Sequence, residues 1–173
     1  MGMILNIYTD AGSGEHNDVW PKEWAVDYIR VWKSNEDYQK VTKEYNIQNR
    51  QTGHYMYIDP DSTAVKYGPL TDENAAYAKW EKVKRGDYVL LKNCKTGEYL
   101  HIENLTGYVE HGEVPTTWWS AQWTESEVDG YTRLINRWQP DYSIHTEDYQ
   151  WLIQYGNVPT TYWTSQWRFI PVS

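Results

Sequence analysis

The sequence is poor in cysteine, in phenylalanine and in basic residues, and each shortage excludes a class of protein. The single cysteine, Cys94, has no partner in the chain, so a disulfide-stapled scaffold is excluded. The 16 basic residues are outnumbered by 24 acidic ones, which gives a net charge of −8. This balance argues against nucleic acid and anionic membranes as partners, because phosphate contacts require Lys and Arg. No apolar run approaches membrane-spanning length, and no signal peptide is recognisable.

Phenylalanine is scarce although aromatic residues are abundant. The sequence has one Phe against 11 Trp and 16 Tyr. A demand for core packing alone would not exclude Phe so strongly. Trp and Tyr suit half-hydrated surfaces, where a flat ring packs and a polar edge forms a hydrogen bond. We therefore expect the Trp residues to be divided between the core and a binding surface.

An internal repeat organises most of the chain. The stretch 93–123 recurs as 136–167 and, with more changes, as 49–80. In each copy a Tyr follows the first Asn by six positions, a Gly follows it by 19 or 20, and a Trp follows that Gly by 11 or 12. These landmarks are Tyr55, Gly68 and Trp80; Tyr99, Gly112 and Trp123; and Tyr142, Gly156 and Trp167. Three copies in register indicate a true repeat.

Each copy predicts about four short strands. In the middle copy, alternation and Tyr, Val, Ile and Trp content place them at 88–93, 98–103, 108–113 and 119–124. No stretch has a sustained helical pattern. The predicted fold is therefore all-β: a β-trefoil of three repeats of about 43 residues, preceded by a short hairpin-like appendage. A propeller would need more blades, and a solenoid is the weaker alternative.

Residues 1–33 lie outside the repeat and resemble part of an enzyme. ILNI at 4–7, Pro21, and VDYIRVW at 26–32 are similar to the last two strands of family 16 glycoside hydrolases, which include laminarinases, agarases and carrageenases. That family's catalytic motif, Glu-x-Asp-x-x-Glu, is absent from the sequence. The resemblance implies that 1–33 is a remnant of a preceding hydrolase domain, 34–40 a linker and 41–173 the trefoil. The alternative is an ordinary N-terminal hairpin of the trefoil itself. Because 1–33 is apolar, we expect its two strands to pack against the trefoil.

Two tryptophans are candidates for a binding surface. Trp119 and Trp163 each lie four positions before the closing Trp of their copy. Positions four apart share one face of a strand, which would make them core residues. The preceding Pro-Thr-Thr loop delays the start of the strand, so Trp119 or its neighbour Trp118 can lie flat on the surface, and likewise Trp163 or Tyr162. A flat aromatic face can stack on the C–H groups of a sugar ring. The closing residues Trp80, Trp123 and Trp167 are assigned to the core.

A carboxylate recurs after the second predicted strand of each copy. The three are Asp59, Glu103 and Glu147, the last one position later because of a one-residue insertion. Ionised carboxylates accept hydrogen bonds strongly, as sugar hydroxyls require, although surface acids are also common at such places. Lys66, Glu110 and Gln154 stand two positions before the Gly of each copy. Their different charges indicate either a solvated face or a position that tunes ligand preference.

The sequence gives no sign of a metal site, a cofactor or a catalytic centre. The five His residues are scattered without metal-ligand spacing, and Asp59-Pro-Asp61 lacks the rest of a calcium loop. A glycosidase needs two facing carboxylates, which three repeat-related single acids do not resemble.

The repeat resembles β-trefoil carbohydrate-binding modules, in particular carbohydrate-binding module family 92. The resemblance rests on YLHIEN at 99–104, GYVEHG at 107–112 and WSAQW at 119–123. It implies a shallow site in each copy, built from a Trp and an acid. These sites map onto Trp119 with Glu103, and onto Trp163 with Glu147. In the first copy Asp59 remains, but Ala76 replaces the Trp and Tyr77 is adjacent. The Gln-x-Trp motif of ricin-type trefoils is absent, so ricin-type galactose sites are not transferred.

The expected function is that of a secreted, monomeric, non-catalytic module that binds polysaccharide at several sites. A β-glucan with β-1,3 or β-1,6 linkages is the preferred ligand, and a red-algal galactan such as carrageenan or agarose is second. A protein-binding trefoil, either an inhibitor or a scaffold, and a surviving enzyme are the rival classes. Two competent sites and one weaker first-copy site are expected.

Overall fold

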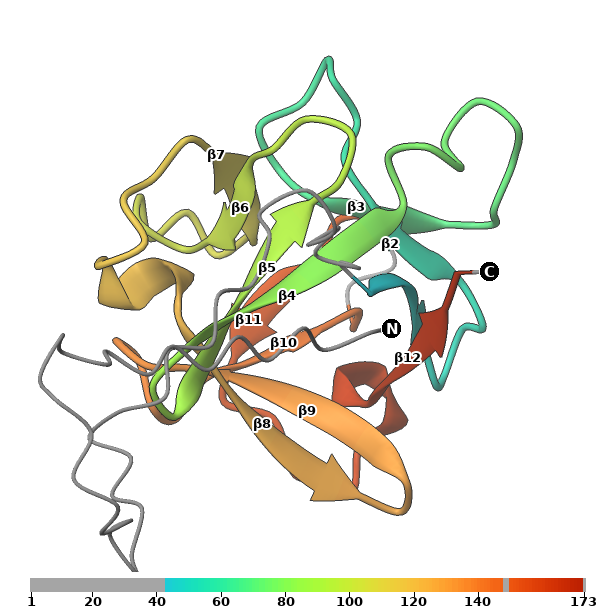
Figure 1. Cartoon of the computed structure of the whole chain (residues 1–173). Helices are drawn as coiled ribbons and strands as arrows, with labels where there is room; N and C mark the ends of the chain where they lie inside the picture. Colours follow the sequence, from blue (N-terminus) through green and yellow to red (C-terminus); the bar gives the residue numbers. More distant parts are fainter. Residues whose placement is uncertain (1–42, 148–149, 173) are drawn as a thin grey trace, which may run out of the picture. The chain divides into compact units, whose positions relative to one another are not determined.

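The computed structural model describes residues 43–147 and 150–172. Twelve short strands are found there, four from each repeat (Figure 1). The first copy supplies β1 (Glu44–Asn49), β2 (Tyr55–Tyr57), β3 (Lys66–Gly68) and β4 (Lys79–Arg85). The second supplies β5 (Tyr88–Asn93), β6 (Tyr99–His101), β7 (Glu110–Gly112) and β8 (Trp123–Val128). The third supplies β9 (Tyr131–Asn136), β10 (Ser143–His145), β11 (Gln154–Gly156) and β12 (Trp167–Pro171).

Six strands close a barrel, and three hairpins cover one end of it. The barrel order is β1, β4, β5, β8, β9 and β12, and β12 returns to pair with β1. The hairpins are β2–β3, β6–β7 and β10–β11. They meet at the pseudo-threefold axis through a ring of backbone hydrogen bonds. Val65 N–H donates to Val109 O at 2.8 Å, Val109 N–H to Ile153 O at 2.7 Å, and Ile153 N–H to Val65 O at 2.9 Å. The predicted β-trefoil is confirmed.

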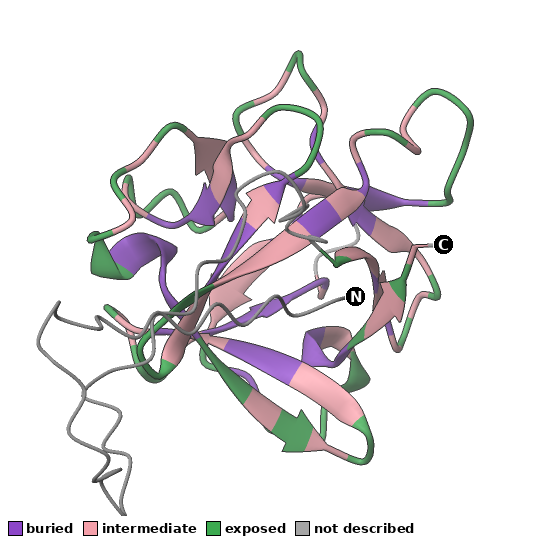
Figure 2. Ribbon diagram, viewed as in Figure 1, coloured by how far each residue is buried: buried purple, intermediate pink, exposed green. Residues whose placement is uncertain are grey.

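The closing tryptophans form the centre of the core. Trp80, Trp123 and Trp167 are fully buried, as predicted, and Figure 2 shows the buried segments inside the barrel and beneath the hairpins. Each indole N–H donates to a carbonyl oxygen of the hairpin strand above it. The acceptors are Met56 O, Leu100 O and Ile144 O. A buried indole therefore joins barrel to hairpin in every copy without an unpaired donor.

The asparagine that begins each repeat fastens it to the previous one. Asn93 is buried, its Oδ1 accepts the N–H groups of Lys95 and Thr96, and its Nδ2 donates to Tyr77 O at 2.8 Å. Asn49 and Asn136 repeat the pattern with the carbonyls of Thr164 and Ser120. The same side chain thus shapes a turn and spans two copies, which explains its recurrence.

The prediction of a strand at 119–124 is wrong at its start, because the strand begins later than expected. Residues Trp119–Ala121 form the 3-10 turn η2, and β8 starts only at Trp123. Trp163–Ser165 forms the equivalent turn η3 before β12. Pro115 lacks an N–H group, and its carbonyl accepts from Trp118 N–H, so the chain tightens into turns instead of extending.

The structure also corrects the predicted register of the third copy, which makes Tyr142 the equivalent of Tyr55 and Tyr99. Tyr55 pairs with Gly68 and Tyr99 with Gly112, but it is Ser143, not Tyr142, that pairs with Gly156. The extra residue therefore lies in the turn before Tyr142. Beyond Ser143 the copies run in register, so Glu147 is equivalent to Asp59 and Glu103 without offset.

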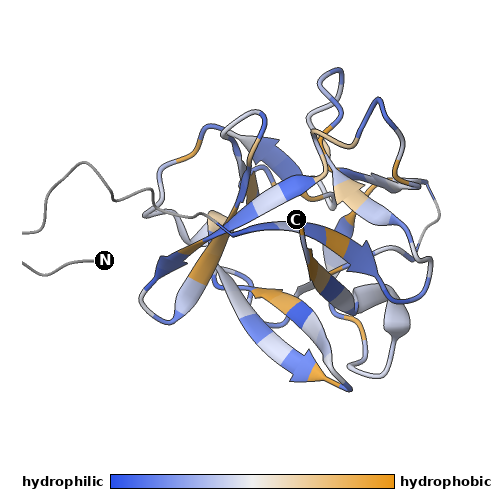
Figure 3. Ribbon diagram, turned by 45° about the vertical axis from the view of Figure 1, so that its right-hand side comes forward, coloured by the Kyte–Doolittle hydropathy of each residue, from blue (hydrophilic) through white to orange (hydrophobic). Residues whose placement is uncertain are grey.

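The landmark glycines are explained by close packing against the neighbouring strand. A Cβ on Gly112 or Gly156 would lie 3.2 Å from a ring nitrogen of His101 or His145. These imidazoles also accept the N–H groups of Glu103 and Glu147, which fixes the turn that carries each carboxylate. Figure 3 shows hydrophobic and hydrophilic residues alternating along the strands.

The interpretations of residues 1–33 and 34–40, including the packing of an appendage on the trefoil, lie outside the described residues and stay predictions. In the described part of the chain, no helix has the length and apolar character needed to cross a membrane. Among the same residues, no group of three or more His, Cys, Asp or Glu could hold a metal ion.

Candidate functional site: two braced tryptophan platforms

The 3-10 turns present their aromatic residues to solvent. Trp119 is 53% exposed and Trp163 is 50% exposed, while their neighbours Trp118 and Tyr162 are 41% and 48% exposed. Trp123 and Trp167, only four positions further on, are fully buried. The sequence therefore separates a surface Trp from a core Trp by means of one short turn. The prediction that Trp119 and Trp163 lie on the surface is confirmed.

Trp119 is stacked against an arginine. The Arg137 guanidinium carbon lies 4.1 Å from the centroid of the Trp119 ring and 4.3 Å from that of Tyr88. Arg137 also donates to Gln122 Oε1 at 2.6 Å, and Gln122 Nε2 donates to Thr116 O. We call Trp119, Arg137 and Tyr88 the Trp119 platform. A cation between two aromatic rings is attracted by both, so one face of the indole is held in place.

The third copy builds the same arrangement. The Arg50 guanidinium carbon lies 4.2 Å from the centroid of the Trp163 ring and 4.6 Å from that of Tyr131. Arg50 donates to Gln166 Oε1 at 2.5 Å and forms an ion pair with Asp129. We call Trp163, Arg50 and Tyr131 the Trp163 platform. In both platforms the arginine covers part of the indole, while about half of the Trp remains exposed and able to stack on a ligand.

The acids predicted to accompany the tryptophans lie next to the same turns. Glu147 Oε1 accepts a hydrogen bond from Thr164 Oγ1 at 3.3 Å, and Thr164 directly follows Trp163. In the second copy, Ile102 N–H donates to Ser120 O at 3.2 Å, so the segment carrying Glu103 is bound to the turn of Trp119. Both carboxylates are half-buried. Glu147 therefore contacts the turn of Trp163 directly, and Glu103 lies in a segment that is hydrogen-bonded to the turn of Trp119.

The first copy lacks the platform altogether. Ala76 stands where Trp119 and Trp163 stand, Cys94 replaces the arginine, and Glu44 takes the place of Tyr88 and Tyr131. Glu44 forms an ion pair with Lys79 at 3.9 Å instead. Three substitutions at one place remove the ring, its brace and its backing ring together.

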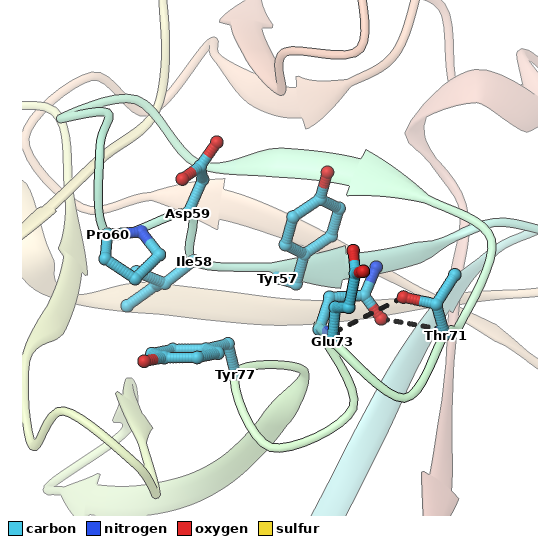
Figure 4. Close-up of a pocket in the computed structure, with 8 residues that line it drawn as sticks. Tyr57, Ile58, Asp59, Pro60, Thr71, Glu73 and Tyr77 are labelled. Atoms are coloured by element: carbon cyan, nitrogen blue, oxygen red, sulfur yellow. Dashed lines mark hydrogen bonds between the residues drawn. The ribbon is translucent and has the colours of Figure 1, made fainter.

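A concave pocket takes the place of a platform in the first copy, and it contains Asp59 and Tyr77. Figure 4 shows the Tyr77 ring beside Pro60 and Ile58, while the polar ends of Tyr57, Asp59 and Glu73 point the same way. Asp59 forms an ion pair with Lys66, whose hydrogen bond holds the pKa of this carboxyl below its usual value. The structure thus brings two predicted site residues together, but with the acid already paired.

The prediction that Glu110 lies on a solvated face is wrong. It is buried, and Asn104 Nδ2 lies 3.2 Å from both of its carboxylate oxygens. The backbone pairing of Glu110 with Ala64 near the threefold axis draws it inward. Burial also lowers the pKa of the neighbouring His101, although the charge of Glu110 opposes this effect. Glu110 therefore belongs to a buried polar cluster and not to the Trp119 platform.

Sequence reasoning missed the residues that hold the platforms: Tyr88, Tyr131, Arg50, Arg137, Gln122 and Gln166. One signal was available. An arginine follows the first Asn in the first and third copies, and Gln precedes the closing Trp in the second and third. The arginine and the Gln occur together only in the third copy, and there they belong to different platforms, because each arginine stacks on the Trp of the preceding copy.

The fold and its repeat geometry define the class of protein as a β-trefoil domain. No protein-family model matches the chain, and no curated protein matches it. Solved structures do. The chain is 63% identical to part of a GlcNAcα1-4Gal-releasing endo-β-galactosidase from Clostridium perfringens, with a TM-score of 0.76. This match covers 96% of the chain and 41% of that enzyme. The chain thus spans well under half of the protein that it resembles.

More distant matches support the fold alone. The designed threefold protein ThreeFoil is 18% identical, with a TM-score of 0.65, over 75% of this chain and 99% of that one. The exo-β-1,3-galactanase 1,3Gal43A from Clostridium thermocellum is 19% identical, with a TM-score of 0.61, over 76% of this chain and 30% of that one.

Proposed function

We propose that the chain is a non-catalytic, multivalent carbohydrate-binding module of a glycoside hydrolase. The observation that carries the proposal is the pair of exposed tryptophans, each stacked on an arginine and each in a turn that is hydrogen-bonded to a segment carrying a carboxylate. An immobilised indole offers a flat face for the C–H groups of a pyranose ring, and the carboxylate accepts from its hydroxyls. Binding to a preorganised ring avoids part of the entropy cost of ordering a side chain.

The similarity to a glycosidase supports the assignment to a larger enzyme. The match with the endo-β-galactosidase covers more of this chain than residues 41–173 contain, so it extends into the residues before position 41. This agrees with the interpretation of 1–33 as the end of a hydrolase domain. We propose that the trefoil holds such an enzyme on its substrate, outside the cell and as a monomer.

We propose a galactose-containing glycan as the ligand, ahead of the β-glucan expected from the sequence. The relative at 63% identity is named for acting on a β-galactoside. A binding module usefully recognises what its enzyme cuts, so a galactoside is favoured. The net charge of −8 disfavours a highly sulfated galactan, because like charges repel.

The test compares glycans and variants of the whole chain. Pull-down against agarose, carrageenan and insoluble β-1,3-glucan, followed by calorimetry with galactobiose and laminaribiose, measures preference. A parallel hydrolysis assay tests the surviving-enzyme alternative. Trp119→Ala and Trp163→Ala remove the platforms, and Trp138→Ala is the matched control, because Trp138 is also exposed but belongs to neither platform.

The expected result is weak binding per site and a clear division between the variants. A site with one stacking ring should have a Kd of about 1 mM. Loss of an aromatic stack worth about 1–3 kcal/mol should weaken that site roughly 5- to 150-fold, while Trp138→Ala changes nothing. No binding to any glycan, or capture of the chain by a protein partner through the same residues, would overturn the proposal.

A further inference from the structure

The two ends of each hairpin place one pair of side chains at the same position in every copy. The first residue of each pair is the one whose backbone carbonyl accepts the N–H of the Asn that begins the repeat. The second residue is the middle residue of β3, β7 or β11. The pairs are His54 with Tyr67, Glu98 with His111, and Tyr142 with Tyr155. Because the backbone is equivalent in all three, any difference between them lies in the side chains that surround them.

Two of these positions are closed. In the first copy, the Trp151 ring packs on His54 at 5.4 Å and on Tyr67 at 5.8 Å between centroids. In the second copy, His111 Nδ1 lies 2.9 Å from Glu98 Oε2, and His111 Nε2 lies 2.7 Å from Ser62 O. One position is therefore filled by an indole and the other by hydrogen bonds.

The third position is open. Tyr142 and Tyr155 lie 6.0 Å apart between ring centroids, and the residue facing them is Gly107. Gly107 is the structural counterpart of Trp151. The carbonyl of Gly107 accepts the N–H of Tyr155, and the carbonyl of Trp151 accepts the N–H of Tyr67. Both residues have a positive φ, 88° at Gly107 and 63° at Trp151. With no side chain at 107, a shallow pocket remains where the first copy has an indole.

The lining of this pocket suits an uncharged sugar. Leu105 and Gly107 come from the second copy, while Gln139, Tyr142, Tyr155 and Asn157 come from the third. None of these side chains is charged. Tyr155 Oη accepts the Gly107 N–H at 3.1 Å, which fixes the phenol ring. Two phenols supply stacking faces, and the amides both donate and accept, as neutral hydroxyls require.

The turn that carries the insertion in the third copy supplies part of the pocket lining. The longer turn between Asn136 and Tyr142 contains Gln139, whose N–H donates to Asn136 Oδ1. Leu105, at the rim, is 51% exposed and has a φ of 51°, a conformation that non-glycine residues rarely adopt. Features from two copies therefore converge on one cavity.

We propose that the Tyr142–Tyr155 pocket is an additional saccharide site that binds a neutral pyranose unit, separate from the Trp119 and Trp163 platforms. The inference rests on the proposed carbohydrate-binding function and deepens it. It lies between the second and third copies, so a polymer bound to a platform gains a further point of attachment. Such linkage raises avidity without strengthening any single contact.

The test uses site-resolved NMR of the whole chain titrated with methyl β-galactopyranoside and methyl β-glucopyranoside. Amide shifts of Gly107 and Asn157 report on the pocket, and the indole N–H shifts of Trp119 and Trp163 report on the platforms. In a Trp119→Ala/Trp163→Ala chain we expect the pocket shifts to persist. Tyr142→Ala should abolish them, and Tyr142→Phe should retain the affinity within about twofold because the stacking face remains.

A filling variant provides an independent check. Gly107→Trp places at this position the residue found at 151 and should weaken binding at the pocket at least tenfold. Gly107→Asn is its control, because Asn tolerates a positive φ but brings no ring, and it should bind nearly as wild type. Shifts at the platforms alone would overturn this inference and leave the proposed function standing. Shifts at neither place would overturn both.

Discussion

Replacing Arg137 with Ala should weaken both the fold and the binding at Trp119, for separable reasons. The guanidinium lies about 4 Å from two ring centroids and donates to Gln122 Oε1. Exposed cation–π contacts are worth about 0.5–1 kcal/mol each, and a hydrogen bond from a charged group about 1.5–3 kcal/mol. These terms are not additive and the site is partly hydrated. We expect a loss of about 1.5–3 kcal/mol in the free energy of unfolding.

The effect on binding follows from the freed indole. Without its brace, Trp119 must be immobilised by the sugar, at a cost of about 0.5–1.5 kcal/mol for one side chain. Affinity at this platform should therefore fall about 2- to 10-fold. The assay is an NMR titration that follows the Trp119 indole N–H, together with urea denaturation of the same variant.

Two further variants test whether the stacking of Arg137 on Trp119 causes the loss of affinity. Arg137→Lys keeps the charge but loses the planar stack, so its affinity should lie between those of wild type and Arg137→Ala. Arg168→Ala removes an exposed arginine that stacks on Tyr131, and should leave the Trp119 titration unchanged. Loss of stability with unchanged affinity would show that Arg137 does not position the indole. A fall beyond 100-fold would show that Arg137 contacts the sugar itself.

Three other outcomes are expected. Asn93→Ala removes three hydrogen bonds of a fully buried side chain and should cost about 2–3 kcal/mol in urea denaturation; a cost below about 0.5 kcal/mol would contradict its role in joining copies. The ion pair with Lys66 lowers the pKa of Asp59, so the pair stabilises the fold above pH 4, by at most about 1 kcal/mol because it is partly exposed, and this stabilisation is lost as the pH falls further. The Asp59→Asn variant should therefore lose stability less steeply than wild type below pH 4. Equal slopes for the two proteins would argue against the pair. Because the first copy has no platform, Asp59→Ala/Tyr77→Ala should reduce binding to polymer less than Glu103→Ala/Trp119→Ala does in calorimetry, and equal losses would refute the ranking of sites.

The fold was largely predictable, because the signals that determine it are local and repeated. Alternation of apolar residues gave β5 with the bounds observed, and the closing Trp residues were correctly assigned to the core. The 3-10 turns were harder to predict. Trp119, Ala121 and Trp123 satisfy the alternation of a strand, and only the hydrogen bonds that follow Pro115 break it. The insertion of the third copy was predicted at the wrong place, because Tyr142 lies at the same spacing from Asn136 as Tyr55 and Tyr99 lie from their Asn residues, although Ser143 is their structural equivalent.

The site could be predicted only in part, because each platform is assembled across copies. Tyr88 and Trp119 belong to the second copy and Arg137 to the third, while Arg50 of the first copy braces Trp163 through the closure of β1 on β12. Alignment of the copies compares residues within each repeat and therefore hides this partnership. It becomes visible only when the barrel order is known.

The crossing of copies also explains why the absence of a platform in the first copy involves residues of two copies. Ala76 and Glu44 lie in the first copy but Cys94 lies in the second, and these three occupy equivalents of Trp119, Tyr88 and Arg137. Once the indole is absent, an arginine at 94 would have no ring to stack on and no Gln partner, because Lys79 stands where Gln122 and Gln166 stand. Lys79 instead forms an ion pair with Glu44. Restoring a third platform should therefore require Ala76→Trp, Cys94→Arg, Lys79→Gln and Glu44→Tyr together. Ala76→Trp alone should add an exposed ring without the affinity of a braced one, and a gain equal to that of the fourfold variant, measured by calorimetry on polymer, would show that bracing contributes nothing.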